Sequence, residues 1–430
     1  MKNRKKGYHQ VTISRKSIIE WKRNLDTRNS FTYRSCRKLV RTLGLSSWLR
    51  RQLNRIIQDH DQVDDVLKLE EILAANNHKP IVVLPPLVDW NIPLFQRPQH
   101  IARQLAQEEL IYFFCTGNCV YDNIFGFQNV AGSLYLTNRF DLLKELNKKK
   151  VFNIYSTDNS LAYDFIEEEL KKGNKILYEY IDEIHPLISG KSIPKSTIDR
   201  HKKILRNEGC MVIASSDKLY KEVMSYRSKN FALITNGVDY YHFRQKFVEN
   251  ELTEDMLLIK NRNKPVIGYF GALAVWFDYA LVQKLAAERP EYEILIIGVN
   301  YDGSLDKYNL KKYSNVTILG PVSYQDLPKY ASIFDISTIP FLKNKITEST
   351  SPIKLFEYMA LGKPIVTTNI TECRKYKSVL IAVDHQDYIK KIDQALALRT
   401  NEEYRTILDR EAKENSWKIK AEQIINLIGE

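Results

Sequence analysis

Short apolar segments alternate with helical segments along most of this 430-residue chain, and this alternation limits the possible folds more than any other feature. A first series of expected strands comprises Ile81–Leu87, Leu110–Phe114, Val151–Ser156, Lys175–Ile181, Met211–Ser215 and Phe231–Thr235. A second series comprises Pro265–Phe270, Glu293–Gly298, Asn315–Gly320, Asp335–Phe341 and Pro364–Thr368. Strands separated by helices in this way predict βαβ units and mostly parallel sheets.

The two series are separated by the turn dipeptide Asn236-Gly237 and by a polar, irregular stretch that extends to Lys264. We therefore expect an α/β protein with two doubly wound sheets in succession. Such sheets bind ligands beyond the carboxyl ends of their strands, so two facing sheets predict a site between domains. Neither series opens with G-x-G-x-x-G, so a dinucleotide oxidoreductase is not indicated. The expected divisions are residues 1–78, 79–245, 246–413 and a last helix at 414–430.

Positive charge is concentrated at the N-terminus. The chain carries 64 Lys and Arg against 52 Asp and Glu, a net charge of +12. Residues 1–58 hold 16 of these cations and 2 of the acids, or +14, so the remaining residues sum to −2. From Ser35 to Ile57, apolar residues at helical spacing are interleaved with arginines, and Gly44 is expected to divide them into two helices. This basic helical extension is therefore where an anionic partner is expected.

Three functions of the extension stay open. It could dock on a membrane, with Leu39, Leu43, Trp48, Leu49 and Leu53 at the acyl boundary and arginines on anionic headgroups. It could instead dock on a partner subunit. Nucleic-acid binding is not favoured, because neither aromatic interleaving nor a known module supports it. We favour the membrane surface.

The remaining composition indicates a cytoplasmic protein. The chain contains no run of about 18 apolar residues, and its basic start has no apolar segment typical of a secretory signal. Its five cysteines lack the spacing of a zinc site and are interpreted as reduced thiols. Without an Asp-x-Asp element at a strand end, no metal and no cofactor are expected. The predicted location is the cytoplasm, peripherally on the inner face of the membrane.

The most informative stretch is ESTSPIKLFEYMALGKPIV, residues 348–366. Ser351-Pro352 is a typical helix start, and the helix is expected to end at Gly362. A helix N-terminus that faces a cleft binds anions, because its free N–H groups point outward. Lys354, one turn in, adds a cation suited to a diphosphate, and Glu357 on the same face can accept both ribose hydroxyls. This arrangement predicts a nucleoside diphosphate site.

This stretch resembles the signature of retaining GT-B glycosyltransferases, especially family 4. Segments in matching order resemble the same family: 213–216, 234–243, 266–273, 293–298, 315–336 and 414–428. The resemblance implies two facing, Rossmann-like, doubly wound domains plus the N-terminal helical extension. It implies a nucleotide-sugar donor, with UDP favoured over GDP, held by the C-terminal domain through Gly271, Ser349, Ser351, Lys354 and Glu357. It also implies a last helix that crosses back to the N-terminal domain.

The sequence departs from the family pattern at two points. Eight residues before Glu357, where the family has its first glutamate, stands Ser349, with Glu348 one step earlier. Either residue could act on the donor sugar. The turn after the first donor-domain strand, Gly271 to Asp278, lacks the cations that the family places there. The diphosphate contacts would then fall to Lys354 and to backbone N–H groups.

The N-terminal domain offers candidate acceptor and catalytic residues. The segment QRPQHIA (96–102) resembles an element of bacterial polysaccharide or teichuronic-acid-type transferases, and it implies acceptor-binding Arg97 and His100 at the cleft rim. Asp182, Glu183 and His185 follow an expected strand and form a titratable cluster. We take Asp182, His185 and Glu348 as the candidate catalytic residues.

The sequence thus predicts a retaining, metal-independent glycosyltransferase that moves a sugar from a nucleotide-sugar to a saccharide acceptor in bacterial cell-surface polysaccharide synthesis. In our interpretation the acceptor is carried on a polyprenyl lipid, which suits an enzyme docked on the membrane surface. In such transfer the leaving diphosphate helps to deprotonate the acceptor, and the protein stabilises developing charge. Two alternatives stay open. A GT-B epimerase acting on UDP-N-acetylglucosamine would turn over its substrate without an acceptor. A non-catalytic GT-B scaffold or partner subunit would bind nucleotide weakly or not at all.

Overall fold

The structure is a computed structural model that describes residues 64–93, 95–158, 160–189 and 192–429. The chain divides into two units, residues 1–77 and 78–430, and each is described by itself. In the first unit a helix covers residues 64–75. The two helices expected from Ser35 to Ile57 lie outside the described residues.

The second unit contains two sheets, and the first has eight strands in the order β3-β4-β2-β1-β5-β6-β7-β8. The strands are β1 Ile81–Leu84, β2 Ile111–Cys115, β3 Phe127–Ala131, β4 Leu134–Thr137, β5 Lys150–Tyr155, β6 Lys175–Tyr180, β7 Cys210–Ala214 and β8 Phe231–Leu233. All neighbours run parallel except β3 and β4. The six predicted strands are present: five are apolar runs that are buried almost throughout, and β8 at the sheet edge is half-buried.

The hairpin of β3 and β4 was not predicted from the sequence. Four of the five β3 side chains, Gln128 to Ala131, are exposed, so the strand has no apolar face to reveal it. The turn between the strands uses Gly132 at φ +52°, a left-handed conformation that glycine adopts readily. The hairpin makes β3 the antiparallel edge strand of this sheet.

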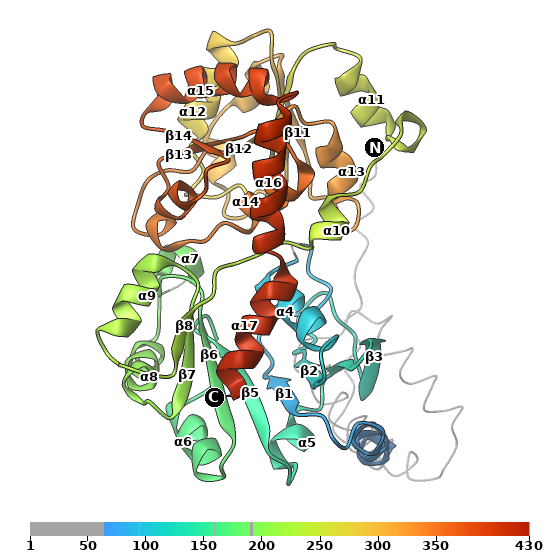
Figure 1. Ribbon diagram of the computed structural model, residues 1–430, viewed down its shortest axis with the longest axis vertical. Coiled ribbons are helices and arrows are strands. Elements are labelled where there is room, and N and C mark those ends of the chain that lie inside the picture. The colour runs from blue at the N-terminus through green and yellow to red at the C-terminus, as the bar shows by residue number, and fades with distance from the viewer. Residues whose placement is uncertain (1–63, 94, 159, 190–191, 430) are drawn as a thin grey trace, which may run out of the picture. The chain divides into compact units, whose positions relative to one another are not determined.

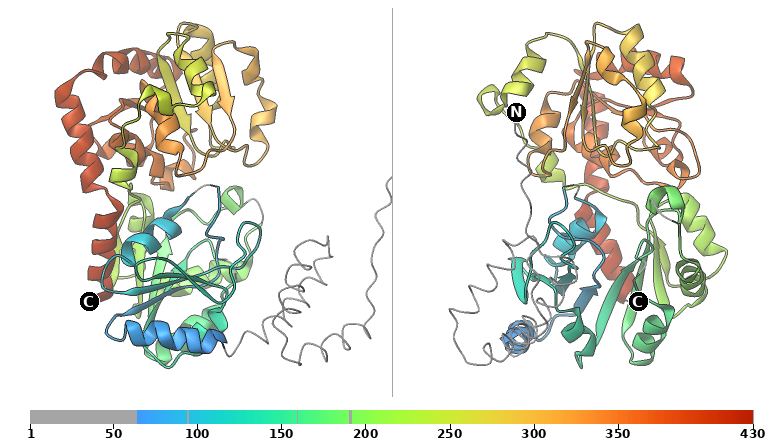
Figure 2. Two further views of the ribbon diagram at one scale, coloured as in Figure 1. Left: turned by 90° about the vertical axis from the view of Figure 1, so that its right-hand side faces the viewer. Right: turned by 180° about the vertical axis from the view of Figure 1, so that it is seen from behind.

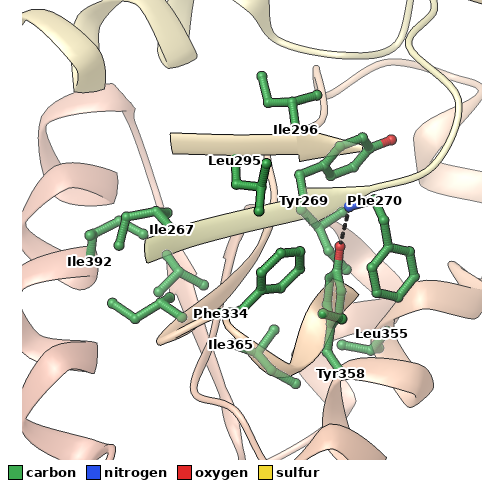
Figure 3. Packing of buried hydrophobic residues seen from close by; sticks show 14 of the residues in the cluster. Ile267, Tyr269, Phe270, Leu295, Ile296, Phe334, Leu355, Tyr358, Ile365 and Ile392 are labelled. Carbon is green, nitrogen blue, oxygen red and sulfur yellow. Dashed lines mark hydrogen bonds between the residues drawn. The ribbon is translucent and has the colours of Figure 1, made fainter. Parts of the chain in front are cut away.

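The second sheet has six parallel strands in the order β11-β10-β9-β12-β13-β14. They are β9 Val266–Phe270, β10 Glu293–Ile297, β11 Val316–Leu319, β12 Ile336–Ile339, β13 Ile365–Thr368 and β14 Val379–Ala382. Figure 3 shows its core, where Ile267, Leu295 and Ile365 pack against aromatic rings and Phe270 N donates to Tyr358 Oη at 3.0 Å. The fold class is therefore as predicted, α/β with two parallel-sheet domains.

Helices cover these sheets (Figures 1 and 2). In the first they are α4 Arg97–Leu105, α5 Phe140–Glu145, α6 Tyr163–Lys171, α7 Pro186–Ser189, α8 Lys195–Arg206 and α9 Asp217–Met224. The helices between and after the strands of the second sheet are α12 Tyr279–Glu288, α13 Leu327–Ser332, α14 Ile353–Leu361, α15 His385–Leu398, α16 Glu402–Glu414 and α17 Trp417–Gly429. The linker contains α10 Tyr240–Phe243 and α11 Glu254–Lys260, where an irregular stretch was expected.

The last helix, α17, lies beside α4 in Figure 1 and contributes to the core of the first sheet. Its buried residues Trp417, Ala421 and Ile424 belong to the same apolar cluster as Ile101 and Leu105 of α4. The chain reaches this position at a bridge between Val238 and Ser416, which joins the linker to the start of α17. Among the described residues, no helix is long and apolar enough to cross a membrane.

Candidate functional site

The carboxyl ends of β9 and β10 approach each other so closely that only glycine fits. Gly271 has φ +138° and Gly298 has φ +155°. A Cβ on Gly298 would lie 1.8 Å from the carbonyl oxygen of Gly271, and a Cβ on Gly271 would lie 2.7 Å from Lys354 Cε. The side chain of Lys354 therefore crosses directly over the end of β9, where ligands of parallel sheets bind.

Lys354 and Glu357 are two titratable residues that act on each other electrostatically but form no direct contact as an ion pair. The Lys354 ammonium lies 5.0 Å from the Phe341 ring centroid and 5.7 Å from that of Tyr269. Neither side chain forms a hydrogen bond or ion pair of 4.0 Å or less with a described residue. Burial lowers the pKa of Lys354 and raises the pKa of Glu357, which is 6% exposed. A ligand that carries both an anionic group and hydroxyl groups would supply partners for both, the anion for Lys354 and the hydroxyls for Glu357.

The start of α14 differs in detail from the prediction. The helix begins at Ile353, its N-cap is Pro352, and it ends at Gly362 with φ 68° as expected. Ser351, which the sequence places at the start of this helix as its cap, does not cap it: Ser351 is 2% exposed and bonds to the linker instead. Its hydroxyl accepts from Asn236 N at 3.3 Å, and its carbonyl accepts from Asn236 Nδ2 at 2.6 Å. Since no side chain caps α14, its first amides remain available for an anion.

The loop after β12 is bonded to the end of β6 through Ser349. Ser349 Oγ donates to Glu183 Oε2 at 2.8 Å, and Lys218 Nζ donates to both side chains at 2.9 Å. These bonds lower the pKa of Glu183, against its partial burial. Ser349 stands where the resemblance expects a glutamate. Through its hydrogen bond the carboxylate of Glu183, which follows a strand of the first sheet, lies beside this position. Glu348, half-buried in the short turn Thr347–Ser349, forms no side-chain bond with a described residue.

Arg97 does not lie at a rim, which corrects the sequence prediction. It is 2% exposed and its Nε donates to Glu179 Oε2 at 2.9 Å. Its Nη1 donates to the carbonyl of Thr235 at 2.9 Å and to Asn236 Oδ1 at 3.2 Å. The anion that Arg97 binds is thus a buried side chain of β6, and the guanidinium also holds the start of the linker.

His100 is also buried, which corrects its predicted place at the rim. It is 3% exposed, stacks on Trp417 at 4.9 Å and meets the edges of Phe95 and Tyr324 at 4.9 and 5.1 Å. Desolvation, helped by Arg103 and His242, holds the pKa of His100 well below its ordinary value. A neutral ring inside an aromatic cluster cannot contact an acceptor while this packing persists.

Asp182 and His185 follow the end of β6 and are half-buried. Burial raises the pKa of Asp182 to about 7, opposed by the nearby guanidinium of Arg97. Its carboxylate forms no hydrogen bond or ion pair with a described residue. His185 interacts electrostatically with Glu183. Asp182 is therefore a carboxylate that can change protonation near neutral pH.

Sequence reasoning did not identify two aspartates that fix the loops beyond β1 and β2. Asp89, 3% exposed, accepts from the amides of Cys119, Val120 and Tyr121 at 2.9, 2.7 and 2.8 Å. Asp122 accepts from the amides of Trp90 and Asn91 at 2.6 and 2.9 Å. Each aspartate thus caps the other's loop. The only sequence signal was an aspartate after a strand end, which is too common to interpret alone.

Comparisons with known proteins agree with this geometry. Residues 264–397 match the family described as Glycosyl transferases group 1. The chain is 26% identical over 383 residues to TuaH of Bacillus subtilis (strain 168), and the match covers 84% of this chain and 92% of TuaH. TuaH carries the provisional name of a teichuronic acid biosynthesis glycosyltransferase. Anabaena Alr3699/HepE in complex with UDP-glucose has a TM-score of 0.60 at 12% identity, covering 82% of this chain and all of that one. A glycosyltransferase from Rickettsia africae ESF-5 has a TM-score of 0.57 at 15% identity, covering 82% and 98%.

The two parallel sheets are those of the GT-B fold. The matched domain contains β9 to β14 and the unpartnered side chains of Lys354 and Glu357. The chain is a glycosyltransferase, and its residues 264–397 match the group 1 family.

Proposed function

We propose that the protein transfers a sugar from a UDP-sugar to a saccharide acceptor in polysaccharide synthesis, and that Lys354 binds the diphosphate. The observation that carries the proposal is the half-buried side chain of Lys354, which lies across Gly271 and has no ion pair within 4.0 Å among the described residues. The first amides of α14 add a second set of donors at the same strand end. Because HepE is solved with UDP-glucose, UDP is the favoured nucleotide.

Glu357 suits the ribose. Its raised pKa results from burial, so the free site holds a carboxyl group that can both donate and accept hydrogen bonds. Two ribose hydroxyls would replace the water that this group has lost. Gly271 contributes by its lack of a side chain, since any Cβ there would displace Lys354.

Glu183 and Ser349 are proposed to position the donor sugar from both sheets. The serine hydroxyl donates to Glu183 and accepts from Lys218, so one of its lone pairs and the second carboxylate oxygen stay available. Lys218 bonds to both groups and holds the loop 345–350 in place. This assembly would take over the role of the family's first glutamate, with Glu348 as the alternative carboxylate.

The transfer itself is proposed to retain the anomeric configuration. The C1–O bond to the diphosphate breaks as the acceptor oxygen forms a bond to C1 on the same face. The proton of the acceptor hydroxyl passes to the leaving diphosphate, whose charge Lys354 and the α14 amides stabilise. Asp182 and His185 are proposed to orient the acceptor, with Asp182 ionised above a pH of about 7. No metal is required in this scheme.

The acceptor is proposed to be lipid-linked, with residues 1–58 docked on an anionic membrane. Those residues lie outside the described part of the chain, so the support is their charge of +14 and their apolar spacing. Release of a variant lacking residues 1–58 from anionic liposomes tests this proposal, and binding that persists after the deletion contradicts it.

A donor screen tests the main proposal. UDP-sugars and GDP-sugars are offered with a lipid-linked oligosaccharide extract, and products are read by mass spectrometry. We expect a product one sugar heavier with a UDP-sugar and no turnover without acceptor. Turnover of UDP-N-acetylglucosamine without acceptor would instead indicate an epimerase, and failure to bind any nucleotide would indicate a scaffold.

A further inference from the structure

A cavity lies at the amino ends of the strands of the second sheet, opposite the carboxyl ends that Lys354 crosses. It has a volume of about 1170 Å³ and is lined by Asp335 and Pro364, the residues that immediately precede β12 and β13. The linker after α10 and the helix α16 form its other walls. Ligand sites typically enclose roughly 300–1,000 Å³, so this cavity has room for more than one small ring.

The cavity is strongly basic although the folded part of the chain is not. Its lining includes six cations, Arg244, Lys246, Lys363, Arg399, Arg405 and Lys413. Only three carboxylates accompany them, Asp335, Glu402 and Asp409. Residues 59–430 as a whole sum to −2, so an excess of three positive charges in one cavity is a local feature. Such a cavity concentrates anions.

The cations crowd one another. Lys363 Nζ donates to the carbonyl of Ser332 at 2.9 Å and has no carboxylate of its own within 4.0 Å. Its pKa is lowered, first by burial, and the neighbouring charges of Arg405 and Arg399 add to the shift against Asp335. An anionic ligand beside Lys363 would relieve both costs.

The lining favours a glycan over other anions. Each of the three guanidinium groups pairs with a lining carboxylate through one nitrogen, Arg399 with Asp335 at 2.7 Å, Arg405 with Glu402 at 3.0 Å and Arg244 with Asp409 at 3.6 Å. Their remaining N–H groups suit the carboxylates of a ligand, and Thr400, Thr406 and Gln245 offer groups that bond to hydroxyls. Lys413 Nζ lies 5.4 Å from the Tyr240 ring centroid, so an aromatic face also lines the wall. A bilayer surface is flat and cannot enter a concave site. An acidic peptide, for which the half-buried Phe247 and Leu361 are the available apolar anchors, is the alternative occupant that the test distinguishes.

We propose that this cavity binds an anionic glycan that bears carboxylate groups, as an exosite that holds a saccharide chain away from the donor site. The inference rests on the proposed function, since it assumes that the enzyme acts on a polysaccharide. The cavity would retain the chain between transfers and so raise the effective concentration of its end at the active site.

The test uses the full chain and a fluorescein-labelled oligogalacturonate, followed by fluorescence anisotropy at low and high salt. The variant Lys246→Gln, Lys363→Gln, Arg405→Gln removes three cations of the cavity. The matched control Lys284→Gln, Lys311→Gln, Lys312→Gln removes three cations of the same domain elsewhere. We expect the cavity variant to bind the probe at least about tenfold more weakly, the control to change by less than about twofold, and salt to weaken binding.

Several outcomes would overturn the proposal. They are failure of the wild-type chain to bind the probe at low salt, equal losses in both triple variants, and displacement of the probe by poly-L-glutamate more readily than by unlabelled oligogalacturonate. UDP affinity is measured in parallel and should be unchanged in both variants. If the wild-type chain failed to bind UDP, the proposed function would fail instead, whatever the glycan result.

Discussion

Near the carboxyl ends of each sheet lie one basic and one acidic side chain, and the two sheets differ in whether these side chains form an ion pair. In the first sheet, Arg97 and Glu179 neutralise each other at 2.9 Å, and the guanidinium also bonds to Thr235 and Asn236. In the second, Lys354 and Glu357 lie on one face of α14 and form no ion pair. Paired charges fix structure, whereas titratable groups that lose water without gaining an ion pair shift toward their neutral forms, and a ligand that pairs with them reverses the shift. The comparison assigns architecture to Arg97 and binding to Lys354.

The largest effect is expected on stability at Arg97. The substitution Arg97→Met leaves the carboxylate of Glu179 buried and unpaired, so the free energy of unfolding should fall by about 3–5 kcal/mol. Arg103→Met on the same helix, which removes a partly exposed guanidinium 4.6 Å from the Phe95 ring, should cost less than about 1 kcal/mol. Urea denaturation measures both. Adding Glu179→Leu to Arg97→Met should restore most of the loss, and an uncompensated double variant would contradict a paired role.

The next effect is expected on nucleotide binding at Lys354. Lys354→Met should weaken UDP binding about 100-fold, because a hydrogen bond between charged groups contributes about 1.5–3 kcal/mol. Its Tm should stay level or rise, since a buried unpaired charge is removed. Calorimetric titration and thermal unfolding provide the two readings. Lys363→Met, another lysine whose pKa burial lowers, is the matched control and should keep its UDP affinity. Lost stability with retained affinity at Lys354 would reverse the comparison.

A smaller effect is expected where the two sheets meet. Ser349→Ala or Glu183→Gln should lower kcat about tenfold while the Kd for UDP changes by less than about twofold, because each removes one charge-assisted bond from the loop beside the sugar. Glu222→Gln, whose carboxylate accepts from Tyr180 Oη at 2.8 Å, is the control and should leave kcat unchanged. Equal losses in kcat and UDP affinity would show that the bond serves the nucleotide.

The smallest effect is expected from metal removal. If Lys354 and the α14 amides carry the diphosphate charge, EDTA should change kcat/KM by less than about twofold. Among the described residues, no group of three His, Cys, Asp or Glu is placed to hold a metal ion. Activity that EDTA abolishes and Mg²⁺ restores would show that the site needs a further cation.

The sequence predicts most of the fold because its strands are buried runs such as Val266–Phe270, whose pattern is local. It does not reveal β3, whose side chains face solvent. Site residues divide in the same way. Lys354 and Glu357 could be found from helical spacing, but the partners of Arg97 lie 82 to 139 residues away and those of Ser351 lie 115 residues away. Such contacts depend on topology, and no local pattern encodes them.

The most direct measurement is the proton uptake that accompanies UDP binding. Burial lowers the pKa of Lys354 and raises that of Glu357 in the free protein, and a bound diphosphate would raise both. At pH 8, where the phosphates of UDP are already ionised, titration calorimetry in two buffers of different ionisation enthalpy should show net proton uptake. UDP affinity should fall as pH rises toward the ordinary lysine pKa. The uptake should shrink in Lys354→Met, and binding without uptake in the wild-type chain would contradict the assignment.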